Sequence, residues 1–218
     1  LENIINKLSE AKVFYTIFNK YRSLFEESDI ILELGGGQGW ASCMVKKELG
    51  KKIYLSDISE YAIAGLSHWE RMFEVQLEGS FACRSYDIPM EDASLDMVFC
   101  YAAAHHFVEH QKSIVEINRV LKKGGKCLYM YEPSCKKYIY PYAYRRVNAK
   151  RPEVPEDVLI YKDMKSYAEA LGMQVQIEFF PSVERRGPVE TIYYYLLNKL
   201  PFLQKQLPCT CNYVFQKH

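Results

Sequence analysis

Residues 31–39 read Ile31-Leu-Glu-Leu-Gly-Gly-Gly-Gln-Gly39, a short apolar run that ends in a cluster of glycines. The run begins near Asp29 and predicts a buried β-strand, and the stretch from Trp40 to Leu49 predicts a helix. Glycines at such a junction let the backbone approach a ligand closely, and the first turn of the helix offers free N–H groups. This unit therefore indicates both the fold class and a ligand site.

The same alternation of strand and helix continues along the chain. Short apolar strands joined by helices predict a parallel sheet that is covered on both faces. We therefore expect an α/β fold, a Rossmann-like doubly wound and mostly parallel sheet of about seven strands. The later strands are expected at Lys52–Ser56, Ser80–Cys83, Leu95–Tyr101, Lys126–Tyr131, Gln174–Phe180 and Thr210–Gln216, and the later helices at Ser59–Phe73, Lys112–Leu121, Asp163–Leu171 and Val189–Leu200.

We expect a single domain over residues 1–218. Apolar side chains at gaps of three and four predict an N-terminal helical cap over residues 1–28. The core follows at residues 29–132, and a polar, tyrosine-rich insert after the fifth strand occupies residues 133–162. Residues 163–218 supply the C-terminal strands and helices.

Composition excludes several classes of protein. Hydrophobic residues make up 49% and charged residues 25%, which is typical of a globular chain. The net charge of +1 lacks the basic excess of proteins that wrap nucleic acid, so no stable nucleic-acid complex is expected. No apolar run reaches the roughly 18 residues of a transmembrane segment. Seven irregularly spaced cysteines and the lack of a secretory pattern predict buried, reduced thiols and a cytoplasmic location. No pattern indicates an oligomeric state.

An acidic residue marks the end of the second predicted strand. Asp57 stands 18 residues after Gly39, where a carboxylate accepts hydrogen bonds from ribose hydroxyls. This spacing predicts a cofactor that contains ribose. A dinucleotide fingerprint of the form G-x-G-x-x-G would require glycine at Trp40 or at Ser42. A nicotinamide-dependent oxidoreductase is therefore the less favoured alternative.

The spacing of Glu33, Gly35, Gly37 and Gly39 resembles the first motif of the class I S-adenosylmethionine-dependent methyltransferases, in particular the type 11 group. Four further motifs of that group follow in order, so that the resemblance covers residues 29–132. They are Leu55-Ser-Asp-Ile-Ser59, Asp87-Ile-Pro-Met-Glu-Asp-Ala-Ser-Leu-Asp-Met-Val-Phe-Cys-Tyr101, Ala104-His-His-Phe107 and Arg119-Val-Leu-Lys-Lys-Gly-Gly-Lys126.

The resemblance implies S-adenosylmethionine as the cofactor and assigns residues to its parts. Asp57 would bind the ribose and Ile58 would pack on adenine. Arg84 stands where the family commonly has an acid, so the adenine contact would pass to Ser85, Tyr86 or Asp87. Near the reactive methyl group the resemblance places Tyr101 and Ala102, and around the methionyl end it places Glu33, Gly35, Gly36, Gly37 and Gly39.

Two histidines follow the fourth predicted strand, where the family has its reactive methyl group. His105 and His106 are candidate bases for a hydroxyl acceptor, because an imidazole titrates near neutral pH. The alternative is that they only shape the loop, since methyl transfer can proceed by positioning alone. A non-catalytic cofactor-binding module is a further alternative, which Arg84 supports.

The insert carries the candidate acceptor site. From Pro133 to Pro152 no acidic residue occurs, and tyrosines interleave with six basic residues, Lys136, Lys137, Arg145, Arg146, Lys150 and Arg151. Inserts at this place in the family often cover the acceptor. We interpret Tyr138, Tyr142, Arg145 and Arg146 as contacts to an anionic or glycan-linked acceptor, with a solvated loop as the alternative. The expected reaction is methyl transfer to a small molecule, glycan or lipid-linked acceptor, with oxygen as the preferred atom.

No metal site is expected from the sequence. His106-Phe-Val-Glu-His110 matches the inverted zinc-peptidase pattern, but it straddles the exit of a strand, whereas that site needs one continuous helix. Cys209 and Cys211 lack a second pair at metal-binding spacing, so we interpret them as core thiols.

Overall fold

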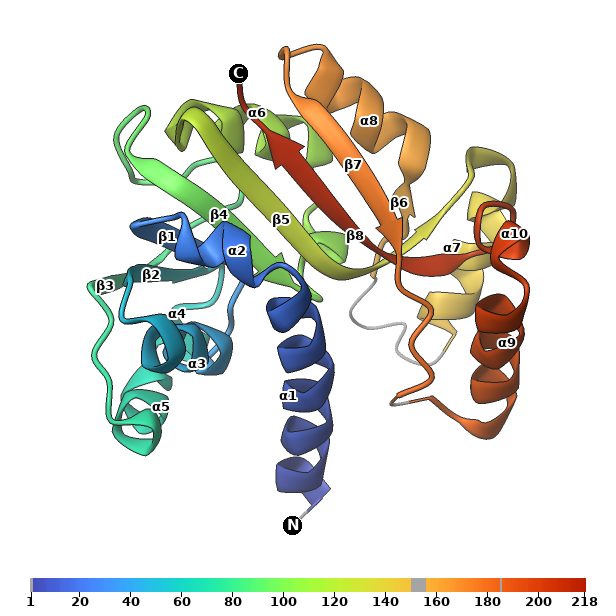
Figure 1. Cartoon of the computed structure of the whole chain (residues 1–218), viewed down its shortest axis with the longest axis horizontal. Coiled ribbons are helices and arrows are strands. Elements are labelled where there is room, and N and C mark those ends of the chain that lie inside the picture. Colours follow the sequence, from blue (N-terminus) through green and yellow to red (C-terminus); the bar gives the residue numbers. More distant parts are fainter. Residues whose placement is uncertain (1, 150–155, 185) are drawn as a thin grey trace.

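A computed structural model describes residues 2–149, 156–184 and 186–218, with side chains described from residue 10 onward. Its centre is an eight-stranded sheet in the order β3-β2-β1-β4-β5-β8-β7, with β6 pairing with β5 beside this path (Figure 1). Within the described residues β8 pairs antiparallel with β5 and β7 and the other strand pairs are parallel, so the predicted fold class is confirmed. The strands are β1 (Ile30–Leu34), β2 (Lys52–Asp57), β3 (Gly79–Ala82), β4 (Leu95–Tyr101), β5 (Leu121–Cys135), β6 (Leu159–Ile160), β7 (Gln174–Phe179) and β8 (Cys209–Gln216).

Helices cover both faces of the sheet. On one face α1, α2, α3 and α5 pack over a cluster that includes Phe14, Phe25 and Phe99. On the other face α6 and α8 pack over Ile117, Met164 and their neighbours. The helices are α1 (Glu2–Lys20), α2 (Arg22–Glu26), α3 (Trp40–Leu49), α4 (Glu60–Ile63), α5 (Leu66–Phe73), α6 (His110–Val120), α7 (Tyr140–Asn148), α8 (Tyr161–Glu169), α9 (Pro188–Lys199) and α10 (Pro201–Gln204). Among the described residues, none of these helices combines the length and apolarity needed to cross a bilayer.

Most predicted elements lie close to where the sequence placed them, but the fifth strand, expected over Lys126–Tyr131, runs over Leu121–Cys135 as β5, and two helical regions also differ. The helix expected over Ser59–Phe73 is divided at Ala64 and Gly65 into α4 and α5, and a Cβ built on Gly65 would lie 3.0 Å from the Gln38 side chain. The Ser59 hydroxyl caps α4 by accepting a hydrogen bond from the Ala62 N–H at 3.2 Å. No helix was predicted within the insert at residues 133–162, where the structure has the regular helix α7. Lys150 and Arg151 lie outside the described residues.

The glycine loop between β1 and α3 fits tightly against the strands below it. Gly39 has a φ of +83°, and a Cβ built on it would lie 2.6 Å from Leu55 and 2.7 Å from Leu66. Gly37 has a φ of +59°, but its Cβ would face open space. Both backbones therefore favour glycine, and only Gly39 is also confined by packing.

We expect Gly39→Ala to lower the free energy of unfolding by about 3 kcal/mol, because left-handed strain adds to overpacking. Gly37→Ala serves as the matched control and should cost about 1 kcal/mol from backbone strain alone. Urea denaturation of the two variants measures both values. Equal losses for the two would contradict the packing of the loop.

Candidate active site

A cleft opens where β1, β2 and β4 end, at the carboxyl edge of the parallel strands. Its volume is about 460 Å³, within the range of small-molecule sites. Predicted cofactor residues that line it are Gly35, Asp57, Ile58, Ser85 and Tyr86. We call this space the cofactor cleft. Its wall also contains Leu34, Cys83, Arg84, Ala103, His106, Phe107 and Val108.

A second cavity of about 280 Å³ lies between the end of β5 and helices α7 and α9. We call it the acceptor cavity. Its wall includes several charged and aromatic side chains, among them His105, Arg146, Glu156, Arg186, Tyr193 and Tyr194.

One short segment separates the two spaces. Ala103 and His106 face the cofactor cleft, while Ala102 and His105 face the acceptor cavity. The segment contains a single 3₁₀ turn, η1 (Ala104–His106). The two predicted catalytic histidines therefore lie on opposite sides of one turn, with their ring centroids 4.2 Å apart.

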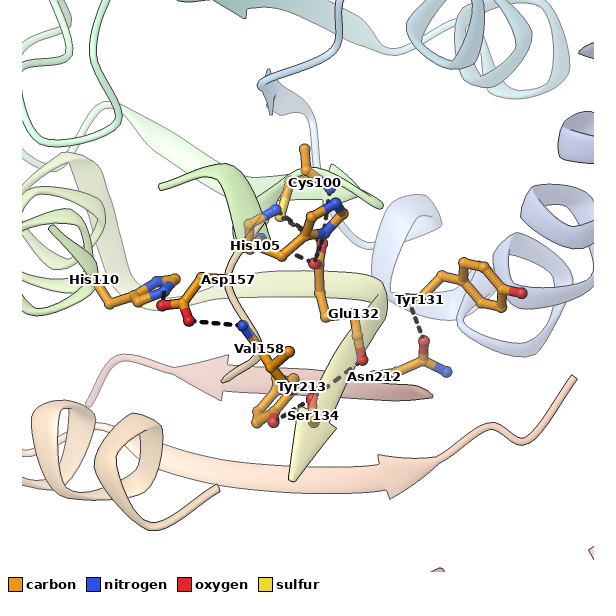
Figure 2. Close-up of polar contacts among 12 residues, drawn as sticks. Cys100, His105, His110, Tyr131, Glu132, Ser134, Asp157, Val158, Asn212 and Tyr213 are labelled. Carbon is orange, nitrogen blue, oxygen red and sulfur yellow. Dashed lines mark hydrogen bonds and ion pairs between the residues drawn. The ribbon is translucent and has the colours of Figure 1, made fainter. Parts of the chain in front are cut away.

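A buried carboxylate holds this turn in place (Figure 2). Glu132 is a residue of β5 and is fully buried. Its side chain accepts hydrogen bonds from the backbone N–H groups of Ala103, Ala104 and His105 at 2.9, 2.9 and 3.1 Å. The His105 Nδ1 lies 2.7 Å from the same carboxylate. Since an ionised carboxylate only accepts, the Nδ1 carries the proton, and Nε2 is the His105 nitrogen left for a ligand.

Burial and charge set the pKa values of this group. Burial acts to lower the pKa of His105, but the Glu132 carboxylate outweighs it and the pKa is raised overall. Burial acts to raise the pKa of Glu132, and the His105 charge with the turn's hydrogen bonds brings it below its usual value. The two groups form a buried ion pair when the His105 imidazole is protonated. The pKa of His106 is lowered by burial and by the charge of His105.

The ends of β4 and β5 depart from regular strand geometry. Ala102 and Tyr131 have φ values of 48° and 64°, a region that residues with side chains rarely adopt. The register of β5 against β8 shifts between Tyr129 and Glu132, and the Asn212 side chain accepts the hydrogen bond of the Tyr131 N–H at 2.9 Å. This register shift is a β-bulge next to Glu132, whose side chain points into the protein and is buried.

Asp57 and Glu33 both organise the glycine loop. The Asp57 carboxylate accepts hydrogen bonds from the Gly37 N–H at 2.8 Å and from the Ser59 N–H at 2.9 Å, and it also lines the cofactor cleft. Glu33 is buried beneath the loop, where it accepts hydrogen bonds from the Ser42 N–H and hydroxyl. Burial raises the pKa of Glu33 to about 7, although the Ser42 hydrogen bonds lower it.

Other predicted cofactor residues lie outside the cleft wall. The loop glycines Gly36, Gly37 and Gly39 do not line it, and Asp87 is exposed in a turn with Arg84. Tyr101 packs edge-on against Phe14 of α1, and its hydroxyl donates to the Glu10 carbonyl at 3.2 Å. No described residue of α1 lines either space.

Of the four predicted acceptor residues, only Arg146 lines the acceptor cavity. It shares one face of α7 with Ala143 and Val147, at helical spacing, so Tyr142 and Arg145 point to solvent. Tyr138 is also exposed, and its hydroxyl donates to the Gln206 carbonyl at 2.8 Å.

The zinc-peptidase pattern does not assemble into that site. Glu109 pairs with Lys112 at 3.3 Å, and His110 contacts Asp157 at 3.2 Å (Figure 2). Of the two histidines and the glutamate of this pattern, His106 alone lines the cofactor cleft.

Sequence reasoning missed Glu132, Glu156 and Arg186. Glu132 carried a usable signal, because it is an acid that directly follows an apolar strand and precedes a proline. Glu156 and Arg186 gave no such signal, since their place at the cavity depends on how α7 and α9 pack on the sheet.

We expect Glu132→Gln to lower the free energy of unfolding by about 3 kcal/mol, because an amide cannot accept from four donors and leaves His105 unpaired. Urea denaturation measures the loss. Glu91→Gln, which changes an exposed carboxylate, is the control and should cost less than about 0.5 kcal/mol. A loss below about 1 kcal/mol for Glu132→Gln would contradict the role of this carboxylate.

Comparisons with known proteins agree with this geometry. The family model described as a methyltransferase domain matches residues 32–129. An uncharacterised methyltransferase-like protein of Schizosaccharomyces pombe is 32% identical over 103 residues, which are 47% of this chain and 38% of that protein. The chain spans well under half the length of the curated relatives it matches.

Solved structures show the same fold at low sequence identity. The geranyl diphosphate C-methyltransferase of Streptomyces coelicolor superposes with a TM-score of 0.70 at 12% identity, covering 87% of this chain and 73% of that one. A putative sarcosine dimethylglycine methyltransferase of Galdieria sulphuraria gives a TM-score of 0.66 at 18% identity, covering 87% and 78%. The resemblance noted in the sequence is confirmed, because the methyltransferase-domain model matches residues 32–129, within the stretch that carries the motifs.

Proposed function

We propose that this protein transfers a methyl group from S-adenosylmethionine to an anionic small molecule, with oxygen as the acceptor atom. The observation that carries the proposal is the meeting of the two spaces at one turn. His106 faces the cofactor cleft and His105 faces the acceptor cavity, so two bound molecules would approach each other there.

The cofactor cleft fits the proposed cofactor in shape and chemistry. A Cβ on Gly35 would lie 3.0 Å from Ala103, so the glycine keeps the floor of the cleft open. Asp57 offers a carboxylate to ribose hydroxyls, and the exposed Ile58 offers an apolar surface to adenine. The geranyl diphosphate C-methyltransferase of the same fold was crystallised with S-adenosyl-L-homocysteine, which supports this assignment.

S-adenosylmethionine, when bound, supplies a methyl group activated by its sulfonium. The chain would then hold the acceptor in line and keep water away. A hydroxyl acceptor must also lose a proton, and each imidazole of the turn can accept it from its own side. The pKa values described above leave His106 the more readily neutral of the two.

Arg186 favours an anionic acceptor. Its guanidinium lies 3.8 Å from the ring centroid of Tyr194 and 5.5 Å from that of Tyr131. Its Nη2 atom is buried and has no hydrogen-bond partner among the described residues. A buried, unsatisfied donor on a cavity wall is costly, and a carboxylate or phosphate oxygen would satisfy it. Arg146 shares the wall but lies 3.8 Å from Glu190, which offsets its charge.

The size of the acceptor cavity favours a small molecule over a glycan or lipid-linked acceptor. About 280 Å³ is near the lower end of ligand sites. The neighbours with named substrates act on geranyl diphosphate and sarcosine or dimethylglycine, which are themselves small and charged. We keep the cytoplasm as the proposed location, because all seven cysteines are free.

The oxidoreductase alternative is weaker in the light of the structure. Trp40, at the place of a dinucleotide glycine, packs edge-on against Phe14 at 5.3 Å and Tyr101 at 5.8 Å. A dinucleotide motif needs a glycine at this position so that the helix can pack closely on the strand, and the partly buried indole of Trp40 does not fit that packing. A non-catalytic module of the same fold remains the second candidate, and turnover distinguishes it.

We expect Asp57→Asn to weaken S-adenosylhomocysteine binding by about tenfold to a hundredfold, because charge-assisted hydrogen bonds to ribose are lost. Calorimetric titration measures the affinity, with NADH in a parallel cell. Asp92→Asn, an exposed aspartate outside the cleft, is the control and should bind as the wild type does. Unchanged affinity in Asp57→Asn, or binding of NADH alone, would contradict the proposed cofactor site.

Release of S-adenosylhomocysteine in the presence of small hydroxylated carboxylates and phosphate esters would identify an acceptor. For an active compound we expect Arg186→Gln to raise KM at least about tenfold, since a charged hydrogen bond is lost. Cofactor affinity should stay unchanged. Arg145→Gln, on the solvent side of α7, is the control. Turnover restricted to neutral acceptors would contradict the role of Arg186.

A further inference from the structure

We propose that His105, His106 and Glu156 form a binding site for a divalent transition-metal cation at the boundary of the two spaces. One potential ligand atom from each residue lies within 4.8 Å of those from the other two. His105 is buried, Glu156 is half-buried and His106 is exposed, so an ion from solvent could reach the group. Small rotations of these side chains would bring the three ligand atoms close enough together for one ion to bind each of them at about 2.1 Å.

The His105 ring is oriented as a metal-bound histidine usually is. Its Nδ1 donates to the buried Glu132 carboxylate at 2.7 Å, and its Nε2 is the nitrogen available to an ion. A carboxylate behind a ligating imidazole fixes the ring and increases its basicity. Glu132 itself is fixed by three backbone N–H groups, so the ring is held before any ion arrives.

Glu156 comes from a distant segment and is positioned by backbone hydrogen bonds. Asn148, at the end of α7, accepts from the Glu156 N–H and donates to the Glu156 carbonyl, both at 2.8 Å. The next residue, Asp157, donates its N–H to the His105 carbonyl at 2.8 Å. Asp157 is held in turn by the Tyr140 hydroxyl and by His110, a contact that Figure 2 shows. These contacts hold Glu156 near the two histidines through its backbone. Its side-chain carboxylate therefore stays available to an ion.

The donor set indicates the class of ion. Two imidazoles and one carboxylate suit zinc, manganese, iron, cobalt or nickel rather than calcium or magnesium, which prefer oxygen ligands alone. Three protein ligands also leave coordination positions open, as catalytic rather than structural sites do. His105 and Glu156 line the acceptor cavity and His106 lines the cofactor cleft, so an ion held by all three would lie between the two spaces.

An ion at this place would occupy the imidazole nitrogens and replace them as the group that activates the acceptor, because it would bind the acceptor oxygen and lower the pKa of its hydroxyl group. This part of the inference rests on the proposed function. The binding of the ion does not, and it can be measured without cofactor or acceptor.

The test is calorimetric titration of chelator-treated, untagged protein with Co²⁺ and Zn²⁺. We expect one ion per chain, and at least a tenfold loss of affinity in His106→Gln and in Glu156→Gln. His106 is exposed and Glu156 is half-buried with no side-chain hydrogen bond described, so these variants should fold. His68→Gln, an exposed histidine on α5, is the matched control and should bind the ion as the wild type does.

The visible spectrum of the cobalt-loaded protein gives an independent readout. Bands of cobalt with nitrogen and oxygen ligands, without a sulfur-to-cobalt charge-transfer band, are expected. A sulfur band would place the ion at a cysteine such as the half-buried Cys83 and overturn the proposal. So would the absence of binding, or equal affinity in His106→Gln, Glu156→Gln and the wild type.

The outcome separates this inference from the proposed function. A protein that binds S-adenosylhomocysteine but neither ion would refute the metal site alone. A protein that binds the ion with the expected losses but not S-adenosylhomocysteine would refute the proposed function alone.

Discussion

The carboxylate of Glu132 is the interaction on which the rest of the site depends. It is fully buried and accepts from three successive backbone N–H groups and from an imidazole. Without this carboxylate each of those N–H groups would be unpaired, because the turn is isolated and is not part of a longer helix. Removing one carboxylate would therefore release the turn, the wall between the two spaces and the orientation of His105 together.

This arrangement requires a local departure from regular geometry on both central strands. Ala102 and Tyr131 adopt left-handed backbone conformations at the ends of β4 and β5, which cost of order 1–3 kcal/mol each. The charged hydrogen bonds to Glu132 and the contact from Asn212 offset that cost. The strain lies beside the two spaces, where it shapes a turn that a regular strand end could not form.

The sequence predicted the parts of the molecule that depend on local pattern. The strand from Leu95 to Tyr101 and the helix from Trp40 to Leu49 were predicted with their observed bounds, because hydrophobic periodicity and glycines mark them. The sequence did not predict α7, because its apolar face is limited to a few residues such as Ala143 and Val147 among many tyrosines and arginines. Without that helix, Arg146 could not be separated from Arg145, although only one of them faces the cavity.

The remaining gaps in the prediction have a common physical cause. Glu156 and Arg186 are brought to the site by tertiary contacts, namely the hydrogen bonds of Asn148 and the rings of Tyr194 and Tyr131. No spacing rule relates them to the glycine loop. Glu132 differs, because an acid between an apolar strand and a proline is visible in the sequence, and only its inward direction needs the bulge.

The division of the walls between different elements has an evolutionary consequence. The cofactor cleft is built by β1, β2 and the segments after β3 and β4, whereas α7, α9 and the start of β8 contribute much of the acceptor cavity. Mutations in the latter elements can change which compound is accepted while leaving the first set intact. Under the proposed function, a lineage of such chains can acquire new acceptors by mutation in its C-terminal half, while the residues of the cofactor cleft are inherited unchanged.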